Sequence, residues 1–196
     1  MSSSPPTLRD RVAGAILEAA ASVLASRGEH ASMSDVAAAA GLARATVYRY
    51  FPSRQSLLDE LARAAVRDAG GRLTEARLDD VAVEDALARA VRALAAVGDR
   101  LVVLERERVR PEPEQFDAAV AEPLRRLFER GQEAGEIRSD VSASSLGESL
   151  VGLVVSVLRS APSLGVEATT AVVTSLFLDG ARGRPSAEAA AQPLGG

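Results

Sequence analysis

Residues 34–58 read SDVAAAAGLARATVYRYFPSRQSLL, and this stretch decides the fold of the N-terminal part of the chain. Small and apolar residues fill its first half until Gly41, a typical residue at the end of a helix. Val47 and Phe51 then lie four residues apart, as on the inward side of a second helix, and Pro52 blocks further helix. The spacing predicts two short helices joined by a tight turn, over residues 35–40 and 42–51.

The outward side of the second helix has an unusual composition. If Val47 faces inward, a turn of about 100° per residue directs Ala45, Thr46, Tyr48 and Arg49 away from the core. Residues 44–54 contain three arginines, two tyrosines and no acidic residue. An ordinary solvent-facing helix more often mixes both charges, whereas phosphates and base edges attract this set of side chains. The pattern favours a helix-turn-helix over a plain three-helix bundle.

Helices are also expected on both sides of this pair. Apolar residues recur at helical spacing from Leu8 onward, and the pattern ends at Arg27-Gly28, a cation followed by a glycine. A fourth helix is predicted to begin near Arg54, after the N-cap Ser53, and to end at Gly70-Gly71.

The quoted run resembles the TetR family of bacterial transcriptional regulators. The Ala-Gly turn, the ending Tyr48-Arg49-Tyr50-Phe51 and the basic residue Arg54 carry the resemblance, which covers residues 8 to about 66. It implies a homodimeric regulator, most often a repressor, that binds a double-stranded DNA operator and responds to a small-molecule effector. The family often has Ser at the position of Ala43 and Gly at that of Ala45, so one phosphate hydrogen bond is expected to be absent.

The resemblance also assigns DNA-binding roles to individual residues. It implies that Ser32 or Ser34, with nearby backbone N–H groups, meets phosphate, and that Tyr48, Tyr50 and Arg54 bind further phosphates. The residues implied to enter the major groove are Arg44, Ala45, Thr46 and Arg49. Two alternatives stay open from the residues themselves: Tyr50 belongs to the core, or Arg54 pairs with Asp35 or Asp59.

The second half of the chain is predicted to be helical as well. Apolar stripes indicate one or two helices over 84–110, divided at Gly98, and a further helix that ends at Gly135. Pro123 either kinks that helix or starts a new one. Two more helices follow, from Ser142 or Ser144 through Leu158 and from Glu167 to Gly180.

We therefore expect an all-α chain with an N-terminal three-helix helix-turn-helix DNA-binding domain and a C-terminal helical ligand-binding and dimerisation bundle. The expected boundaries are 8–55 for the first domain, with its motif at about 32–51, 56–181 for the second, and 182–196 for a disordered tail. The apolar stripes supply the candidate pocket residues for an apolar or amphipathic effector: Leu61, Val91, Leu94, Leu101, Leu104, Phe116, Val120 and Leu127. The last two helices supply a candidate dimer interface, with an intramolecular core as the alternative: Leu150, Val154, Val157, Val173 and Phe177.

Composition excludes several classes of site. The chain has no cysteine and one histidine, His30, so disulfides and His/Cys metal sites are not expected, and no cofactor is predicted. No constellation of catalytic residues is apparent, so the chain is not expected to be an enzyme. No secretory signal is present and no apolar run approaches the roughly 20 residues that span a bilayer, so a cytoplasmic location without membrane association is expected.

Taken alone, the net charge of −4 argues against DNA binding, but the charge is unevenly distributed. Residues 1–55 hold six arginines against four acidic residues, whereas the rest of the chain holds 17 against 23. A local basic face is sufficient for phosphate binding, because screening limits the influence of distant charges to about 10 Å. Two alternatives to a regulator remain: a helical ligand-binding or scaffold dimer without operator binding, and an enzyme on a helical bundle.

Overall fold

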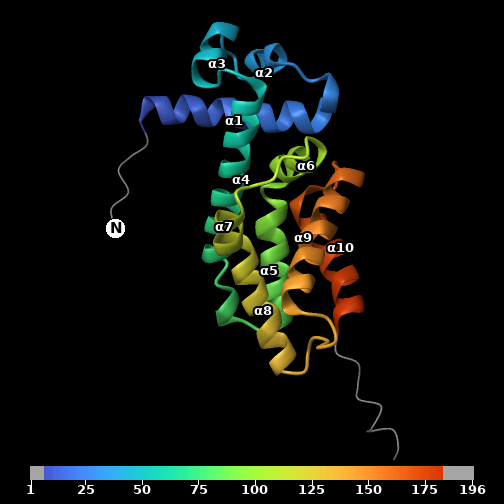
Figure 1. The fold of residues 1–196 in the computed structure, drawn as a ribbon. Coiled ribbons are helices and arrows are strands. Elements are labelled where there is room, and N and C mark those ends of the chain that lie inside the picture. The colour runs from blue at the N-terminus through green and yellow to red at the C-terminus, as the bar shows by residue number, and fades with distance from the viewer. Residues whose placement is uncertain (1–6, 183–196) are drawn as a thin grey trace, which may run out of the picture.

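The computed structural model describes residues 7–182, and in this range the chain folds into helices joined by turns, with one isolated antiparallel bridge between Ile137 and Arg182 (Figure 1). The all-α prediction is thereby confirmed. The predicted tail 182–196 lies, apart from Arg182, outside the described residues. The α-helices are α1 (Leu8–Arg27), α2 (Met33–Ala39), α3 (Arg44–Tyr50), α4 (Arg54–Glu75), α5 (Val83–Ala95), α6 (Gly98–Arg106), α7 (Pro113–Phe116), α8 (Glu122–Glu133), α9 (Ala143–Ser160) and α10 (Gly165–Ala181).

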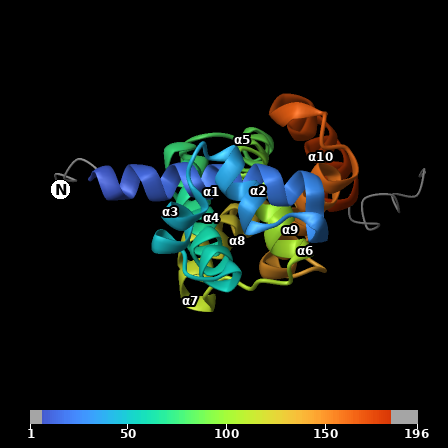
Figure 2. The same ribbon diagram turned by 90° about the horizontal axis from the view of Figure 1, so that it is seen from above.

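Helices α1, α2 and α3 form a head at one end of the molecule, and α4 runs from this head into a body of longer helices (Figure 1). In the body, α5 packs against α10 and α8 packs against α9. Viewed from above, α1 lies across the end of the body, with α6 close beneath it (Figure 2). The head is therefore positioned by α4 and α6 together.

Local sequence signals explain how the head helices begin and end. Thr7, Ser32 and Ser53 cap α1, α2 and α4 with their side-chain oxygens, each in a capping box. The turn between α2 and α3 passes through Gly41, whose φ of +66° is a left-handed conformation that glycine adopts without a steric penalty. The sequence therefore sets the positions of α2 and α3 locally.

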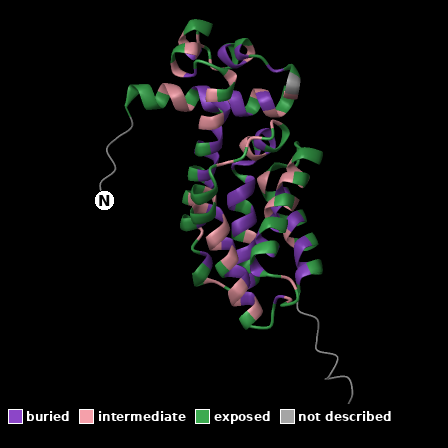
Figure 3. Ribbon diagram, viewed as in Figure 1, coloured by how far each residue is buried: buried purple, intermediate pink, exposed green. Residues whose placement is uncertain are grey.

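Two apolar cores lie along the molecule, with the buried residues on the facing sides of the helices (Figure 3). The head core includes Ile16, Val36 and Val47, and it continues into α4 as far as Ala64. The body core is formed mainly by α5, α8, α9 and α10. Because α4 contributes to both cores, the apolar packing of the head does not stop at the expected boundary after residue 55.

The prediction that α4 ends at Gly70-Gly71 is wrong, because the helix continues to Glu75. A Cβ atom at position 70 would lie 2.8 Å from the Cβ of Ala119, so Gly70 lets the segment around Ala119 pack closely on α4. That segment is η3 (Asp117–Ala121), a turn of π-helix between α7 and α8. Pro123 follows in the first turn of α8, where its missing N–H and its ring disrupt the regular pattern before it.

Candidate nucleic-acid interface and effector pocket

Helix α3 carries the candidate nucleic-acid interface at the end of the head that faces away from the body (Figure 1). Val47 is fully buried and Phe51 is 5% exposed, and together they fix the rotation of α3 on the head core. Arg44, Ala45 and Arg49 are consequently exposed, while Thr46, Tyr48 and Tyr50 are half-buried. All six candidate contact residues of α3 retain some exposed surface.

The arginines of α3 stack on tyrosine rings. The guanidinium of Arg44 lies 5.4 Å from the ring centre of Tyr48, and that of Arg49 lies 5.8 Å from the ring centre of Tyr50. Neither arginine forms an ion pair with an acidic residue in the described part of the chain. Stacking restrains the two side chains and leaves their positive charge available to an external anion.

Arg9 of α1 is a neighbour of this surface that sequence reasoning missed. Its guanidinium lies 6.0 Å from the ring centre of Tyr50, on which Arg49 also stacks, and a shallow surface hollow joins Leu8, Arg9, Arg49 and Tyr50. No local signal could have placed Arg9 there, because the contact depends on how α1 crosses α3.

The two serines before and within α2 differ in their surroundings. The Ser32 hydroxyl donates to the Asp35 carboxylate at 2.6 Å and accepts the Asp35 backbone N–H, while Arg27 donates to the same carboxylate. These hydrogen bonds hold the pKa of Asp35 below its ordinary value, mainly through the Ser32 hydroxyl. Ser34 is exposed and has no side-chain partner in the described chain. The N-cap position of α3, Ala43, provides no side-chain hydrogen bond, in keeping with its lack of a hydroxyl.

Arg54 has partners that the sequence did not predict. Its guanidinium donates to the backbone carbonyl of Ala31 at 2.6 Å and to the Glu107 carboxylate at 2.7 Å, while Asp59 accepts from Gln55 instead. Both contacts of Arg54 are partly buried, and they link the start of α4 to the segment before α2 and to the end of α6. Arg54 is therefore not among the DNA contacts proposed below.

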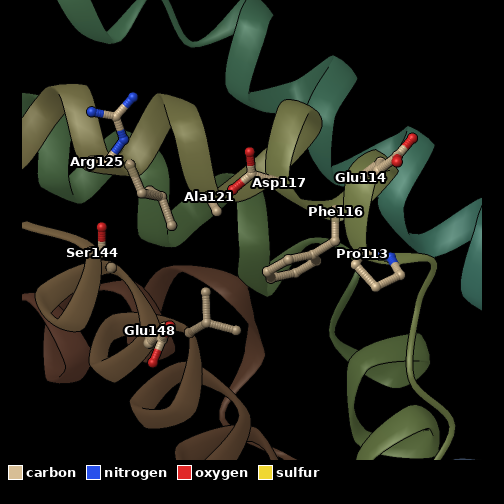
Figure 4. Close-up of a pocket in the computed structure, with 11 residues that line it drawn as sticks. Pro113, Glu114, Phe116, Asp117, Ala121, Arg125, Ser144 and Glu148 are labelled. Carbon is tan, nitrogen blue, oxygen red and sulfur yellow. The ribbon is translucent and has the colours of Figure 1, made fainter.

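A pocket of about 620 Å³ opens on the body between α9 and the segment formed by α7, η3 and α8 (Figure 4). Its lining residues are Pro113, Glu114, Phe116, Asp117, Ala121, Leu124, Arg125, Ser144, Gly147, Glu148 and Val151.

The pocket differs from the predicted set of ligand-binding residues, of which only Phe116 lines it. Leu61 is fully buried in the head core, and Leu104 packs on Ala62 and Ala65. Leu101 is half-buried against the body core, and the others are buried within that core: Val91, Leu94, Val120 and Leu127. The predicted residues occupy the most apolar positions of the helices. In the structure these side chains pack against one another in the core and leave no cavity between them for a ligand.

The predicted dimer residues also lie largely inside the single chain. Leu150, Val154 and Val173 are fully buried, Phe177 is 8% exposed and stacks on Phe128, and Val157 is half-buried against the body core. This burial favours the alternative of an intramolecular core, since a fully buried side chain has no surface left for a partner, and the dimer interface stays a prediction. On α10 the exposed apolar residues are instead Val172 and Leu176, which are 39% and 56% exposed and one turn apart.

Other classes of site are not supported by the described residues. Within residues 7–182, no group of His, Asp or Glu is arranged to hold a metal ion. Over the same range, no helix is both long enough and apolar enough to cross a bilayer. The helix-turn-helix geometry and the unpaired arginines of α3 thus define the class of the protein: a helix-turn-helix DNA-binding protein with an all-α body.

Comparisons with known proteins show which family the N-terminal part of the chain matches. Residues 16–61 match the family model described as "Bacterial regulatory proteins, tetR family". The HTH-type transcriptional repressor LfrR of Mycolicibacterium smegmatis is 53% identical over 55 residues, which are 28% of this chain and 29% of that protein. The sequence match thus spans less than a third of that relative.

Solved structures extend the likeness to the body. The TetR-like transcriptional regulator LfrR from Mycobacterium smegmatis, in complex with proflavine, has a TM-score of 0.74 at 25% identity and covers 89% of this chain and 98% of that one. A tetR-family regulatory protein from Rhodococcus RHA1 has the same fold, with a TM-score of 0.69 at 21% identity over 89% of this chain and 99% of that one. The head thus matches the tetR family of bacterial regulatory proteins in sequence, and the chain as a whole has the fold of a TetR-like regulator.

Proposed function

We propose that the protein is a homodimeric transcriptional repressor that binds a two-fold symmetric operator through α3 and leaves it when a small molecule occupies the body. The observation that carries the proposal is the outer surface of α3, where Arg44 and Arg49 are exposed and lack acidic partners. The LfrR complex with proflavine supports a small-molecule effector, because that regulator has a similar fold over almost its whole length.

The side chains of α3 suit the two kinds of contact that an operator requires. Arg44 and Arg49 can donate paired hydrogen bonds to guanine or bind phosphate, and Ala45 can touch a thymine methyl group. The hydroxyls of Thr46, Tyr48 and Tyr50 are suited to phosphate or base edges. Most other arginines of the protein, Arg63, Arg92 and Arg138 among them, are bound to carboxylates and are less available.

Binding to a two-fold operator requires two heads at a fixed separation, of one helical turn of DNA or about 34–36 Å, or a multiple of it. We place the contact between subunits on the exposed side of α10, around Val172 and Leu176, because these are among the few large apolar side chains left in solvent. A ligand that shifts the body helices would then change the separation of the heads and weaken operator binding.

The DNA part of the proposal is tested by selecting sequences from a random pool with the purified protein and measuring affinity at two salt concentrations. We expect a two-fold symmetric consensus and a steep loss of affinity with salt. Uniform binding to all sequences, or none, would leave the alternative of a helical ligand-binding dimer without operator binding.

The dimer is tested by light scattering on two variants. Leu176→Arg should yield a folded monomer, since it places a charge on an exposed surface. Leu150→Arg should instead fail to fold, since Leu150 is fully buried in the chain. A folded Leu176→Arg variant that remains dimeric would place the interface elsewhere.

A further inference from the structure

The pocket between α9 and η3 combines an apolar interior with an uneven distribution of charge. Leu124, Ala121 and Val151 supply aliphatic surface, and the ring of Phe116 extends into the space between the two walls (Figure 4). Asp117 borders the pocket from η3, and Glu148 borders it from α9 on the other side. Glu114 lies at the outer edge, with its carboxylate directed away from the other labelled side chains (Figure 4).

The carboxylates of Asp117 and Glu148 have no counterion in the described chain. Neither group takes part in a hydrogen bond or ion pair there, whereas other acidic residues of the body, such as Glu122, Asp140 and Glu167, have an arginine partner. Arg125 is the one cation among the described lining residues, and its guanidinium is already held by Glu122 and Glu129. The pocket is consequently negative, with two carboxylates free to bind a positive charge.

This arrangement discriminates between classes of small molecule. An anion such as a fatty acid would be repelled by both carboxylates, and a neutral apolar molecule would remove water from them without offering a replacement partner. A cation would satisfy them and could also approach the face of Phe116, where the ring quadrupole is attractive. Apolar substituents on the cation would fill the space beside Leu124 and Val151.

We propose that this pocket binds a bulky organic monocation with aromatic or aliphatic substituents, held between Asp117 and Glu148. The inference rests on the proposed function in one respect, since it takes the occupant of the body to be the effector that releases DNA. Binding to the protein alone does not depend on that role and is measured first.

The decisive experiment uses two probes of nearly the same shape and opposite charge, tetraphenylphosphonium and tetraphenylborate. Each is titrated by calorimetry into the full chain in the absence of DNA. We expect saturable binding of the phosphonium with a one-to-one stoichiometry, and binding of the borate weaker by at least about tenfold. Equal affinity for the two ions would overturn the proposal, because charge would then not select the ligand.

Variants locate the site. The double substitution Asp117→Asn and Glu148→Gln should weaken phosphonium binding by about tenfold or more, since both charges are lost with little change in shape. The substitution Glu133→Gln removes an exposed carboxylate of α8 that does not line the pocket, and it should leave the affinity unchanged. An equal effect of the control would assign the binding to overall charge and contradict the proposed site.

Reversing the charge at Glu148 should create affinity for the anionic probe, and a misfolded protein would not gain such affinity. Glu148→Lys should weaken phosphonium binding and strengthen tetraphenylborate binding, because Glu148 is exposed and the lysine can extend over the pocket. Circular dichroism checks that each variant is folded. A folded Glu148→Lys protein with unchanged preference would exclude this pocket as the cation site.

Release of the selected operator by tetraphenylphosphonium is measured last. If the phosphonium binds at the pocket but no DNA is bound specifically, the inference stands and the proposed function fails. If the operator is bound and the pocket does not select the cation, the proposed function stands and the inference fails.

Discussion

Arg44 and Arg49 of α3 share one property, which is a positive charge that the surrounding protein leaves available. No acidic side chain of the described chain neutralises either guanidinium, and each stacks on a tyrosine. We expect Arg49→Ala to cost about 1–3 kcal/mol of discrimination at one operator position, as the loss of a bidentate base contact would. Fluorescence anisotropy on the selected operator and on single-base variants measures this.

Arg126→Ala is the matched control for charge, since Arg126 is exposed on α8, far from α3, and has no ion-pair partner in the described chain. It should leave both affinity and base preference unchanged. If Arg49→Ala weakened binding to all sequences equally, Arg49 would be a phosphate contact instead.

Asp35 connects the electrostatics of a single residue to the stability of the helix-turn-helix. Its pKa lies below the ordinary value of 3.8, chiefly because the Ser32 hydroxyl and backbone N–H donate to the carboxylate. A lowered folded-state pKa means that Asp35 contributes stability above its unfolded-state pKa, and that this contribution disappears as the pH falls through the folded-state value. Thermal unfolding of the wild type and Asp35→Asn should therefore differ at pH 7, and the difference should shrink progressively as the pH falls below about 4.

A difference between the two proteins that persists unchanged at acidic pH would show that the carboxylate charge is not the source of the effect. Asp59→Asn provides a comparison, because within residues 7–182 the Asp59 carboxylate accepts a hydrogen bond from Gln55 alone, on an exposed part of α4.

Two adjacent glycines of helix α4 have different surroundings, and this difference predicts opposite effects of alanine substitution on stability. A Cβ atom at Gly70 would meet Ala119 of η3, including its backbone oxygen at 3.2 Å, whereas nothing lies within 4 Å of a Cβ atom at Gly71. Gly70→Ala should destabilise the protein by about 1–3 kcal/mol through overpacking. Gly71→Ala should stabilise it by about 0.5–1 kcal/mol, because alanine favours the helix interior.

Denaturant unfolding monitored by circular dichroism distinguishes the two variants. Stabilisation by both substitutions would mean that η3 moves away from α4 at little cost. Since η3 also borders the pocket, Gly70→Ala is further expected to change the affinity for a pocket ligand.

At the scale of the whole molecule, α6 is the element through which the body holds the head. Arg100 of α6 bridges Glu18 of α1 and Asp68 of α4, and Arg106 donates to the carbonyl of Ala25 at 2.5 Å. On its other side, α6 packs on α9, where Gly98 meets Leu158. A shift of α9 at the pocket would therefore reach α1 through α6.

The ion pair between Arg54 and Glu107 is a further contact of the head with the end of α6, and substitutions test whether its role is structural. Both side chains are partly buried, so Glu107→Gln and Arg54→Ala should each cost about 1 kcal/mol of stability. Neither should flatten the salt dependence of operator binding, because Arg54 is occupied within the protein. The contrary result, a shallower salt slope for Arg54→Ala alone, would restore Arg54 as a phosphate contact.

The sequence by itself determined the head. Capping residues, Gly41, Pro52 and the spacing of Val47 and Phe51 act over a few residues, so the bounds of α2 and α3 and the outward side of α3 could be predicted closely from local rules. The separation of a basic head from an acidic body was likewise visible as charge along the chain.

Only the tertiary structure decided the partner of Arg54, the position of the pocket and the surface left for a second subunit. Arg54 and Glu107 are 53 residues apart in sequence, and the pocket is formed by two separate segments, residues 113–125 and 144–151. Periodicity identifies which side of a helix is apolar, but an apolar residue such as Leu61 or Leu150 can fill a core, line a cavity or meet a partner. The packing of the helices against one another makes that choice, and it leaves Asp117 and Glu148 facing an unfilled space.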